Sequence, residues 1–356
     1  MQINSYNSKI FITEEPDSEL EQAIREIDPD KIFVIVDRNT KKYCLPLLPK
    51  LKTNQKVQLI ETGQGEKNKN LESVVHIWNK LTVNLAGRNS LIINLGGGLL
   101  SDMGGFAASA FKRGIRFINV PTTLLSMVDA SVGGKVGVNF MHLKNHIGVF
   151  NSPGMVFISS SFLRTLPERQ LYAGWAEMIK HGLIHSPSHL FNLLETSPEE
   201  LGKDRLNEFI FESISIKNYF VTNDPFEKNI RKALNFGHTL GHAFESLSQD
   251  MSTPLLHGEA IANGMLCELF LSVEKSGFQE KEFERIKEYI QKYYPIFNAD
   301  VKLVRTVLDI ARQDKKNRGE KINFTLLEGA GNYSLDQYVE EALIEKSLKQ
   351  IMSTAR

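Results

Sequence analysis

The segment SLIINLGGG, residues 90–98, joins a short and nearly continuous apolar run to three consecutive glycines. An apolar run of this length is typical of a strand that is buried on both faces of a parallel sheet. Glycines at the end of such a strand let the main chain approach a ligand, and a following helix offers free N–H groups to a phosphate. The dinucleotide fingerprint is incomplete, because Ser101 stands where its third glycine belongs. The segment is therefore compatible with a nucleotide site and with a tight structural turn.

The pattern around this segment alternates between strands and helices. Apolar runs at 32–37, 56–62 and 116–123 predict further strands, and the residues RNTKK after Asp37 resemble a turn. Helical spacing appears at 71–85 and 101–114, so we predict a parallel α/β sheet. After Pro167 almost every segment has helical spacing, with one late strand-like run at 322–328. We therefore predict an α/β plus α protein, with a nucleotide-binding domain at 1–166 and a mostly helical metal- and substrate-binding domain at 167–356.

Composition narrows the choice of partners and compartment. The 356 residues carry 42 basic and 42 acidic side chains, so no net charge attracts nucleic acid. Cys44 and Cys267 lie far apart without a CxxC motif, which favours a reducing compartment over a disulfide framework. The first residues lack an apolar signal-peptide core, and no apolar run approaches the ~18 residues of a membrane span. We expect a soluble cytoplasmic protein without nucleic-acid or membrane partners.

Two glycine-rich stretches, at 129–139 and 143–154, have the composition of loops. They hold side chains whose donors and acceptors suit a phosphate or a carboxylate ligand. A solvated loop without a ligand is the alternative. The polar members are Asp129, Lys135, Asn139, Lys144 and Asn145.

Histidines and carboxylates recur at helical spacing in the second half. Glu177, Lys180 and His181 share one helix face, where a functional site and a surface ion pair are equal alternatives. His238 and His242 have the i, i+4 spacing that can bind one metal ion, on a stripe that also holds Asn235 and Glu245. His257 and Glu259 begin another helix. Nitrogen and carboxylate ligands without thiolate suit Zn²⁺, Mn²⁺, Co²⁺ or Fe²⁺, whereas core histidines would need no metal.

Seven motifs in order resemble one family, 3-dehydroquinate synthase of the sugar-phosphate cyclase superfamily. They are GGGLLSDMGGFAASAFKRG, INVPTTLLSMVDASVGGKVGVN, LKNHIGVFNSP, LRTLPERQLYAGWAEMIKHGLI, DPFEKNIRKALNFGHTLGHAFE, LHGEAIANGM and DKKN. The resemblance implies an N-terminal NAD-binding domain, a C-terminal helical domain and a site between them. It implies conversion of the sugar phosphate 3-deoxy-D-arabino-heptulosonate 7-phosphate into 3-dehydroquinate and phosphate, with catalytic NAD⁺ and Zn²⁺ or Co²⁺.

The same resemblance assigns roles to residues. The metal ligands match Glu177, His238 and His257, so the family pattern places His242 with the substrate phosphate instead. The other substrate contacts match Asp129, Lys135, Asn145, Lys180, Lys217, Arg231, Asn235 and one of Lys315 or Lys316. Arg113 matches an arginine that reaches the neighbouring subunit's phosphate site, which implies a homodimer. The NAD contacts match Asp37, Asn39, Glu66, Lys69, Gly97, Gly98, Asp102, Thr122, Thr123 and Lys144. Val136 departs from the pattern, since many members carry threonine there.

Three other classes of protein compete with this interpretation. Sister cyclases act on sugar phosphates that lack a carboxylate, so they need not keep cations such as Lys217 and Arg231 for it. A metal-dependent polyol dehydrogenase would release NADH and would need no phosphate pocket. A binding or scaffold protein would require the whole polar constellation to be incidental.

Overall fold

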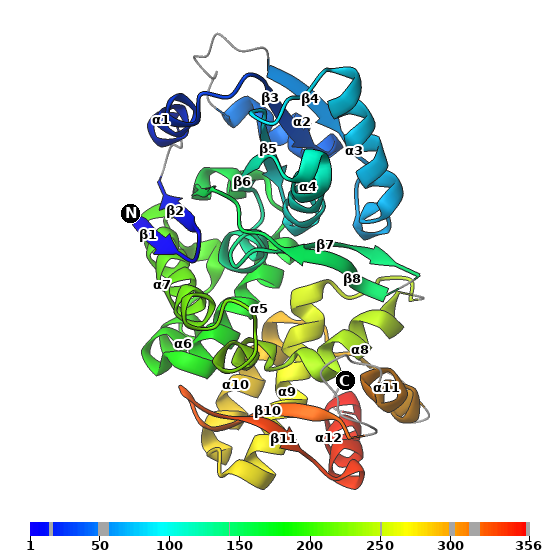
Figure 1. Ribbon diagram of the computed structural model, residues 1–356. Coiled ribbons are helices and arrows are strands. Elements are labelled where there is room, and N and C mark those ends of the chain that lie inside the picture. Colours follow the sequence, from blue (N-terminus) through cyan, green and yellow to red (C-terminus); the bar gives the residue numbers. More distant parts are fainter. Residues whose placement is uncertain are drawn as a thin grey trace. The chain divides into compact units, whose positions relative to one another are not determined.

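The computed structural model describes residues 1–13, 17–48, 57–141, 143–249, 251–298, 303–312 and 321–353 (Figure 1). The chain divides into two compact units. The first comprises Met1–Pro167 with Gly202–Thr222, and the second comprises Glu168–Leu201 with Asn223–Arg356. The sequence predicted a single boundary after residue 166, whereas the structure returns the chain to the first unit over Gly202–Thr222. The helix α7 (Lys203–Asn223) makes this return, and its Asn218 amide donates to the Asn4 carbonyl at 3.0 Å.

A seven-stranded sheet forms the centre of the first unit. Its order is β1-β2-β9-β6-β5-β3-β4, and every neighbouring pair except β1 and β2 is parallel. The predicted parallel-sheet fold is therefore confirmed. The strands are β1 (Gln2–Ser5), β2 (Ser8–Ile12), β3 (Ile32–Val36), β4 (Val57–Glu61), β5 (Leu91–Gly96), β6 (Arg116–Pro121) and β9 (Met155–Ile158). The helices of this unit besides α7 are α1 (Asp17–Ile27), α2 (Arg38–Tyr43), α3 (Leu71–Val83) and α4 (Gly98–Ala110).

The order of the strands reverses between β3 and β5. The chain passes from β3 to β4 on one side, then returns to add β5 and β6 on the other side of β3. Strands β3 and β5 are buried along their whole lengths, as their apolar sequences predict. In parallel α/β sheets, ligands bind outside the carboxyl ends of the strands at such a reversal. The turn at Gly97, which follows β5, lies at this edge.

The two glycine-rich stretches are not the loops that their composition suggested. Most of their residues form an antiparallel pair, β7 (Lys135–Phe140) and β8 (Leu143–Phe150), which Figure 1 shows as a long hairpin. Gly137 and Gly148 lie opposite each other, and a β-carbon on either would come within about 2.5 Å of a carbonyl oxygen on the other strand. Glycine here serves close strand pairing, which composition alone does not distinguish from loop flexibility.

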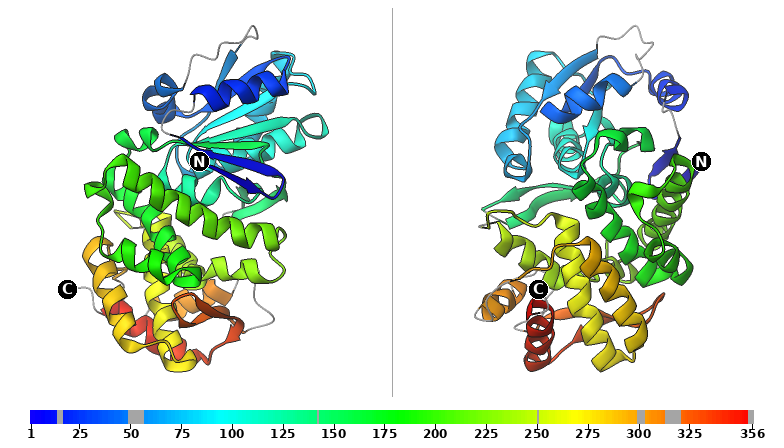
Figure 2. Two further views of the ribbon diagram at one scale, coloured as in Figure 1. Left: turned by 90° about the vertical axis from the view of Figure 1, so that its left-hand side faces the viewer. Right: turned by 180° about the vertical axis from the view of Figure 1, so that it is seen from behind.

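The second unit is mostly helical, as predicted, and carries one two-stranded sheet (Figure 2). A long buried element of this unit is α9 (His257–Ser276), which is buried on all sides along most of its length. The other helices are α5 (Glu168–His185), α6 (Pro187–Leu194), α8 (His238–Ser248), α10 (Glu280–Tyr293), α11 (Leu303–Arg312) and α12 (Glu341–Ser353). The predicted late strand is β10 (Asn323–Gly329), and it pairs with β11 (Asn332–Tyr338), which the sequence analysis missed. Among the described residues, no helix has the length and apolarity needed to cross a membrane.

Candidate metal and cofactor sites

Three side chains from three helices of the second unit converge on one point. Glu177 lies in α5, His238 begins α8 and His257 begins α9, and one ligand atom of each lies within 4.8 Å of the others. Both histidines direct Nε2 at the same carboxylate oxygen, Glu177 Oε1, at 3.6 Å for His238 and 3.2 Å for His257. Two imidazoles and one carboxylate are a common catalytic set for Zn²⁺ that leaves coordination positions open. The donor set therefore fits a divalent transition metal.

The protonation states of this group follow from burial and charge. Burial alone would raise the pKa of Glu177, but the ammonium of Lys180 and the two histidines outweigh it and hold that pKa well below its usual range. Burial and the charge of Lys180 lower the pKa of His238 well below 6.5, so its ring is neutral. Burial opposes a charge on His257, yet the carboxylates of Glu245 and Glu177 raise its pKa to about 10. A metal ion would replace the proton that His257 carries between these two carboxylates.

Main-chain contacts fix the helices that carry the candidate ligands. A β-carbon on Gly258 would lie 1.9 Å from the Ala173 carbonyl oxygen, so the start of α9 rests directly on the backbone of α5. A β-carbon on Gly264 would lie 2.0 Å from the Gly237 carbonyl oxygen, so α9 also touches the turn that precedes His238. His238 Nδ1 lies 3.1 Å from the Phe236 carbonyl oxygen. This contact places the proton on Nδ1 and leaves Nε2 free to bind a metal.

An ion pair holds α9 to the first turn of α5. Arg169 donates from Nε and from a terminal nitrogen to both oxygens of Glu259 at 2.6 Å, and also to the Pro254 carbonyl at 2.7 Å. Glu259 also accepts the backbone N–H of Leu256 at 2.7 Å, which caps α9. The Glu259 side chain is almost fully buried. This bidentate contact secures the segment that contains His257.

The carboxyl edge of the first unit's sheet brings together several residues predicted to bind NAD. Asp37 follows β3, Gly97 and Gly98 follow β5, and Thr122 with Thr123 follows β6. Asp37 caps α2 and accepts the Thr40 backbone N–H at 2.8 Å, so the expected turn after β3 is in fact a short helix. Thr123 donates to Ser126 at 2.9 Å. These residues lie where the reversal in strand order predicts a ligand.

Gly98 has a packing role in this structure besides any role in binding. A β-carbon on Gly98 would lie 2.9 Å from the β-carbon of Ala130, whereas on Gly97 it would lie 3.2 Å from Thr123 Cγ2. From the sequence, glycine at both positions is expected to allow a ligand to approach the main chain closely. The contact with Ala130 is a second reason for glycine at 98, and it applies without any ligand.

A buried lysine connects further predicted residues of the first unit. Lys69 Nζ donates to Asp102 Oδ2 at 2.6 Å and to Asn145 Oδ1 at 2.5 Å. Asn139 accepts the backbone N–H of Asn145 at 2.9 Å and donates to Glu66 at 2.8 Å. Burial raises the pKa of Asp102, and the charge of Lys69 opposes this rise. The network joins residues assigned to NAD with Asn145, which was assigned to the substrate.

Two predicted cations have partners of their own. Lys217 donates to Asp129 Oδ1 at 2.5 Å and to its backbone carbonyl at 2.6 Å, within the first unit. In the second unit, the guanidinium of Arg231 donates to the Pro225 carbonyl at 2.6 Å. Asp224 accepts the backbone N–H of Arg231 at 3.2 Å and so shapes the loop around it. Both cations are buried, which makes them costly unless they serve a ligand or a structural pair.

Comparison with known proteins agrees with the motifs. The family model described as the 3-dehydroquinate synthase N-terminal domain matches residues 59–173, and the model of the C-terminal domain matches residues 174–317. A 3-dehydroquinate synthase of Parabacteroides distasonis is 44% identical over 96% of this chain and 96% of its own length. The chain belongs to the 3-dehydroquinate synthase family.

Two of the solved structures similar to this member of the 3-dehydroquinate synthase family are synthases with bound NAD⁺ and a metal ion. A 2-deoxy-scyllo-inosose synthase complexed with carbaglucose-6-phosphate, NAD⁺ and Co²⁺ has a TM-score of 0.83 at 25% identity and covers 98% of this chain and 99% of that one. A 2-epi-5-epi-valiolone synthase of Streptomyces hygroscopicus with NAD⁺ and Zn²⁺ has a TM-score of 0.84 at 22% identity, covering 99% and 98%. The second likeness shows the fold alone.

The remaining residues that the 3-dehydroquinate synthase pattern singles out have varied surroundings. His242 is exposed, with its ring centre 5.2 Å from that of His238 and 5.9 Å from that of His257. Asn235 donates to Glu227 at 2.9 Å. Lys315 and Lys316 lie outside the described residues. Other exposed members of the set are Asn39, Glu66, Arg113, Lys135, Lys144 and Asn145.

Sequence reasoning placed Glu245 on the stripe of His238 but gave it no role, and it missed Arg169 and Asp224. Glu245 contacts His257, Arg169 holds Glu259, and Asp224 shapes the loop of Arg231. Glu245 had a usable signal, since it follows His238 by seven residues and so shares its helix face. Arg169 had none, because its partner lies 90 residues away.

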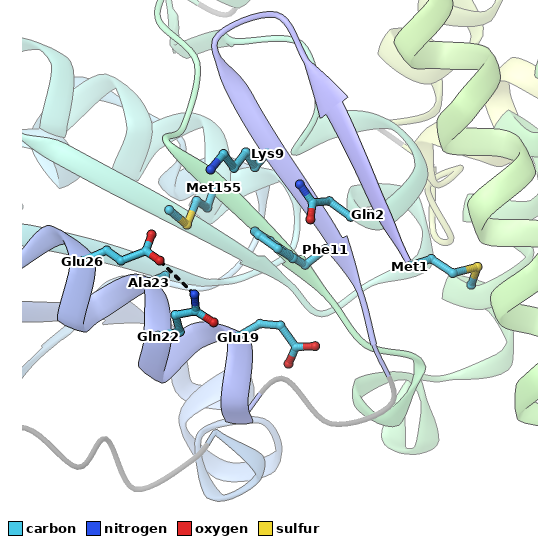
Figure 3. Close-up of a pocket in the computed structure, with 9 residues that line it drawn as sticks. All are labelled: Met1, Gln2, Lys9, Phe11, Glu19, Gln22, Ala23, Glu26 and Met155. Atoms are coloured by element: carbon cyan, nitrogen blue, oxygen red, sulfur yellow. Dashed lines mark hydrogen bonds between the residues drawn. The ribbon is translucent and has the colours of Figure 1, made fainter.

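A separate hollow of about 440 Å³ lies between the N-terminal hairpin and α1 (Figure 3). Figure 3 shows Phe11 and Met155 beside Lys9 along its wall. Gln2, Lys9, Phe11 and Met155 come from the neighbouring strands β1, β2 and β9, so the hollow lies against a face of the sheet beside α1. Ligands of parallel α/β sheets bind instead at the carboxyl edge, where the strand order reverses. We assign this hollow no role in the 3-dehydroquinate synthase site.

Proposed function

We propose that this chain is a 3-dehydroquinate synthase, a phosphate-eliminating lyase that converts 3-deoxy-D-arabino-heptulosonate 7-phosphate into 3-dehydroquinate and phosphate. The observation that carries the proposal is the convergence of Glu177, His238 and His257, at the positions that the family motifs assign to the metal. The identity to 3-dehydroquinate synthases over nearly the whole chain supports the choice of substrate.

We assign Zn²⁺ or Co²⁺ to Glu177, His238 and His257. The ionised carboxylate and the neutral ring of His238 suit such an ion, and the similar 2-deoxy-scyllo-inosose synthase holds Co²⁺. Glu177, His238 and His257 would hold this ion, and it would supply the Lewis acidity that lowers the pKa of the substrate hydroxyl at C5. Lys180, which is paired with Glu177, would keep a positive charge next to the developing alkoxide.

We assign NAD⁺ to the carboxyl edge of the first unit's sheet. Gly97 offers the uncapped start of α4 to the pyrophosphate, and the network of Lys69, Asp102 and Glu66 adds polar contacts nearby in sequence and structure. NAD⁺ held by these residues would supply reversible hydride transfer at C5, with no net oxidation of the substrate.

The chain's own residues would mainly position the substrate. The C5 ketone acidifies the proton at C6, and the substrate's own phosphate can take that proton as it leaves. Charge-assisted hydrogen bonds would hold the phosphate. Their donors would be Lys135, Asn145 and His242 of one chain, together with Arg113 of the partner subunit. Lys217 and Arg231 would hold the carboxylate. After re-reduction, ring opening and an intramolecular aldol reaction would close the carbocycle, which requires orientation more than further acid–base groups.

We propose that the enzyme is a homodimer whose subunits share a phosphate site. Lys112, Arg113 and Gly114 have φ values of +49°, +70° and +108°, an unfavourable conformation that presents Arg113 to solvent. The hairpin in the same unit exposes Phe140, Met141 and Phe150. If Arg113 serves the neighbouring subunit, mixing Arg113→Ala with Lys135→Ala dimers should restore up to about a quarter of wild-type activity through one intact site. Heterodimers without recovered activity would contradict the shared site.

The test of function is one incubation with the heptulosonate phosphate and a parallel one with glucose 6-phosphate in its place. The purified chain is mixed with the heptulosonate phosphate, substoichiometric NAD⁺ and Zn²⁺, and released phosphate and NADH are both measured. Phosphate release beyond the amount of NAD⁺, without accumulating NADH, is the expected result. Accumulating NADH without phosphate would identify a polyol dehydrogenase. Turnover of glucose 6-phosphate in place of the heptulosonate would identify a sister cyclase.

A further inference from the structure

Glu245 touches the ring nitrogen of His257 that faces away from Glu177. Its Oε2 lies 3.2 Å from His257 Nδ1, while His257 Nε2 lies 3.2 Å from Glu177 Oε1. Glu245 is buried in α8, two helical turns after His238. One helix therefore carries a candidate ligand and the carboxylate that contacts a second candidate ligand.

Close packing of α8 against α9 makes this contact available. A β-carbon on Gly241 would lie 3.0 Å from the Ala260 carbonyl oxygen, and one on Gly264 would lie 2.7 Å from the Gly241 nitrogen. The helices thus meet through their backbones along the stretch between His238 and Glu245. A glutamate side chain is long enough to cross this narrow gap to His257.

On the basis of the proposed function, we infer that Glu245 is a positioning residue that fixes the tautomer and orientation of His257 for the metal. A carboxylate that accepts the Nδ1–H proton leaves the Nε2 lone pair directed at the metal and makes that nitrogen a stronger donor. His238 receives the equivalent support from the Phe236 carbonyl. Each histidine then has a different acceptor behind it, one neutral and one charged.

A second arrangement of the same residues has to be weighed against this one. His242, Glu245 and His257 also have ligand atoms within 4.8 Å of one another, so Glu245 could be a ligand itself. His257 would then use Nδ1, and Glu177 would remain outside the site. We favour the support role because both His238 and His257 direct Nε2 at the fully buried Glu177, whereas His242 is exposed.

The test measures metal affinity and coordination rather than turnover. Zn²⁺ affinity is determined by chelator competition for the wild-type chain and for Glu245→Gln, Glu245→Ala, Glu177→Gln and His242→Asn. We expect about tenfold weaker binding for Glu245→Gln, which keeps a neutral acceptor, and up to about 100-fold for Glu245→Ala. Glu177→Gln should nearly abolish binding, and His242→Asn should stay within about threefold of wild type.

Spectra of the Co²⁺-loaded chains separate support from general damage. Glu245→Gln should shift the Co²⁺ visible bands while its circular dichroism remains that of the wild type. Wild-type affinity and spectrum in both Glu245 variants would overturn the inference. Loss of binding in Glu245→Gln and His242→Asn but not in Glu177→Gln would make Glu245 a ligand and would refute the proposed metal site itself. Loss only in Glu177→Gln would leave that site standing and refute the role of Glu245 alone.

Discussion

Replacing Lys69 by methionine tests the buried contact between Lys69 and Asp102. The two side chains are 6% and 16% exposed and meet at 2.6 Å, so methionine removes the charge while filling most of the volume. Without this cation, the buried Asp102 carboxylate would take up a proton, since burial already raises its pKa. Protonating a carboxyl group of ordinary pKa 3.8 at pH 7 costs about 4 kcal/mol. This cost is the upper limit on the stability that the variant loses through Asp102.

We expect Lys69→Met to lower the free energy of unfolding of the first unit by about 2–4 kcal/mol at pH 7. The penalty should depend on pH in a fixed direction. The folded variant holds a proton that the unfolded chain releases above pH 3.8, so its stability rises as the pH falls. The penalty should therefore shrink by roughly 1.4 kcal/mol for each pH unit below 7.

Urea unfolding between pH 5 and pH 7, followed by circular dichroism, measures this penalty. Lys41→Met is a matched control, because Lys41 and Glu61 also meet at 2.6 Å in the first unit but are 50% and 45% exposed. That exposed pair should contribute no more than about 1 kcal/mol. Lys69→Met with Asp102→Asn should lose the dependence on pH. Equal penalties for the two lysine variants, or a penalty that grows toward acid, would refute the reasoning.

Further predictions concern both units. Arg169→Ala should lower the Tm of the second unit by about 4–8 °C, because the bidentate contact with Glu259, worth roughly 2 kcal/mol, is lost. Calorimetry measures this shift, and an unchanged Tm would show that the contact does not stabilise the unit. Burial would raise the pKa of Asp224, but backbone N–H groups of the following loop lower it below 3.8, so its contribution is present above that pH and is lost in acid. Asp224→Asn should therefore lower the urea midpoint at pH 7 and have little effect at pH 2; equal effects at both would disprove it. Gly98→Ala should lower the free energy of unfolding, measured in urea without NAD⁺, by about 1–3 kcal/mol, because the new methyl group meets Ala130. A stability equal to that of the wild type would leave ligand binding as the only reason for this glycine.

The sequence predicted the parts of the fold that local pattern controls. The apolar run before Gly96 is a fully buried strand, and the helical spacing from Leu71 gives α3 within two residues of its predicted end. The sequence patterns did not predict strands whose pairing partners lie far away in the sequence. The first strands of the chain and β9 were missed because their burial depends on one another, and the 143–150 strand is exposed along almost its whole length. Exposed strands show no apolar alternation to detect.

The candidate site divides in the same way. Spacing alone favoured His238 with His242, since both lie on one helix. The contact of His257 with Glu177 depends on how α5 and α9 pack, and only the family motifs pointed to His257 as a candidate ligand. Contacts such as Lys69 with Asn145 join residues 76 positions apart, so no local rule could reveal them.

The backbone contacts at Gly258 and Gly264 also limit how this site can evolve. Because the ligand-bearing helices touch without intervening side chains, repacking of the core cannot gradually widen or narrow the gap between His238 and His257. A lineage under selection for a different metal would have few neutral intermediates along that route. Variation in metal preference should therefore arise from exchange of a ligand or of the group behind it, while substitutions accumulate freely on the outer faces of α10 and α11.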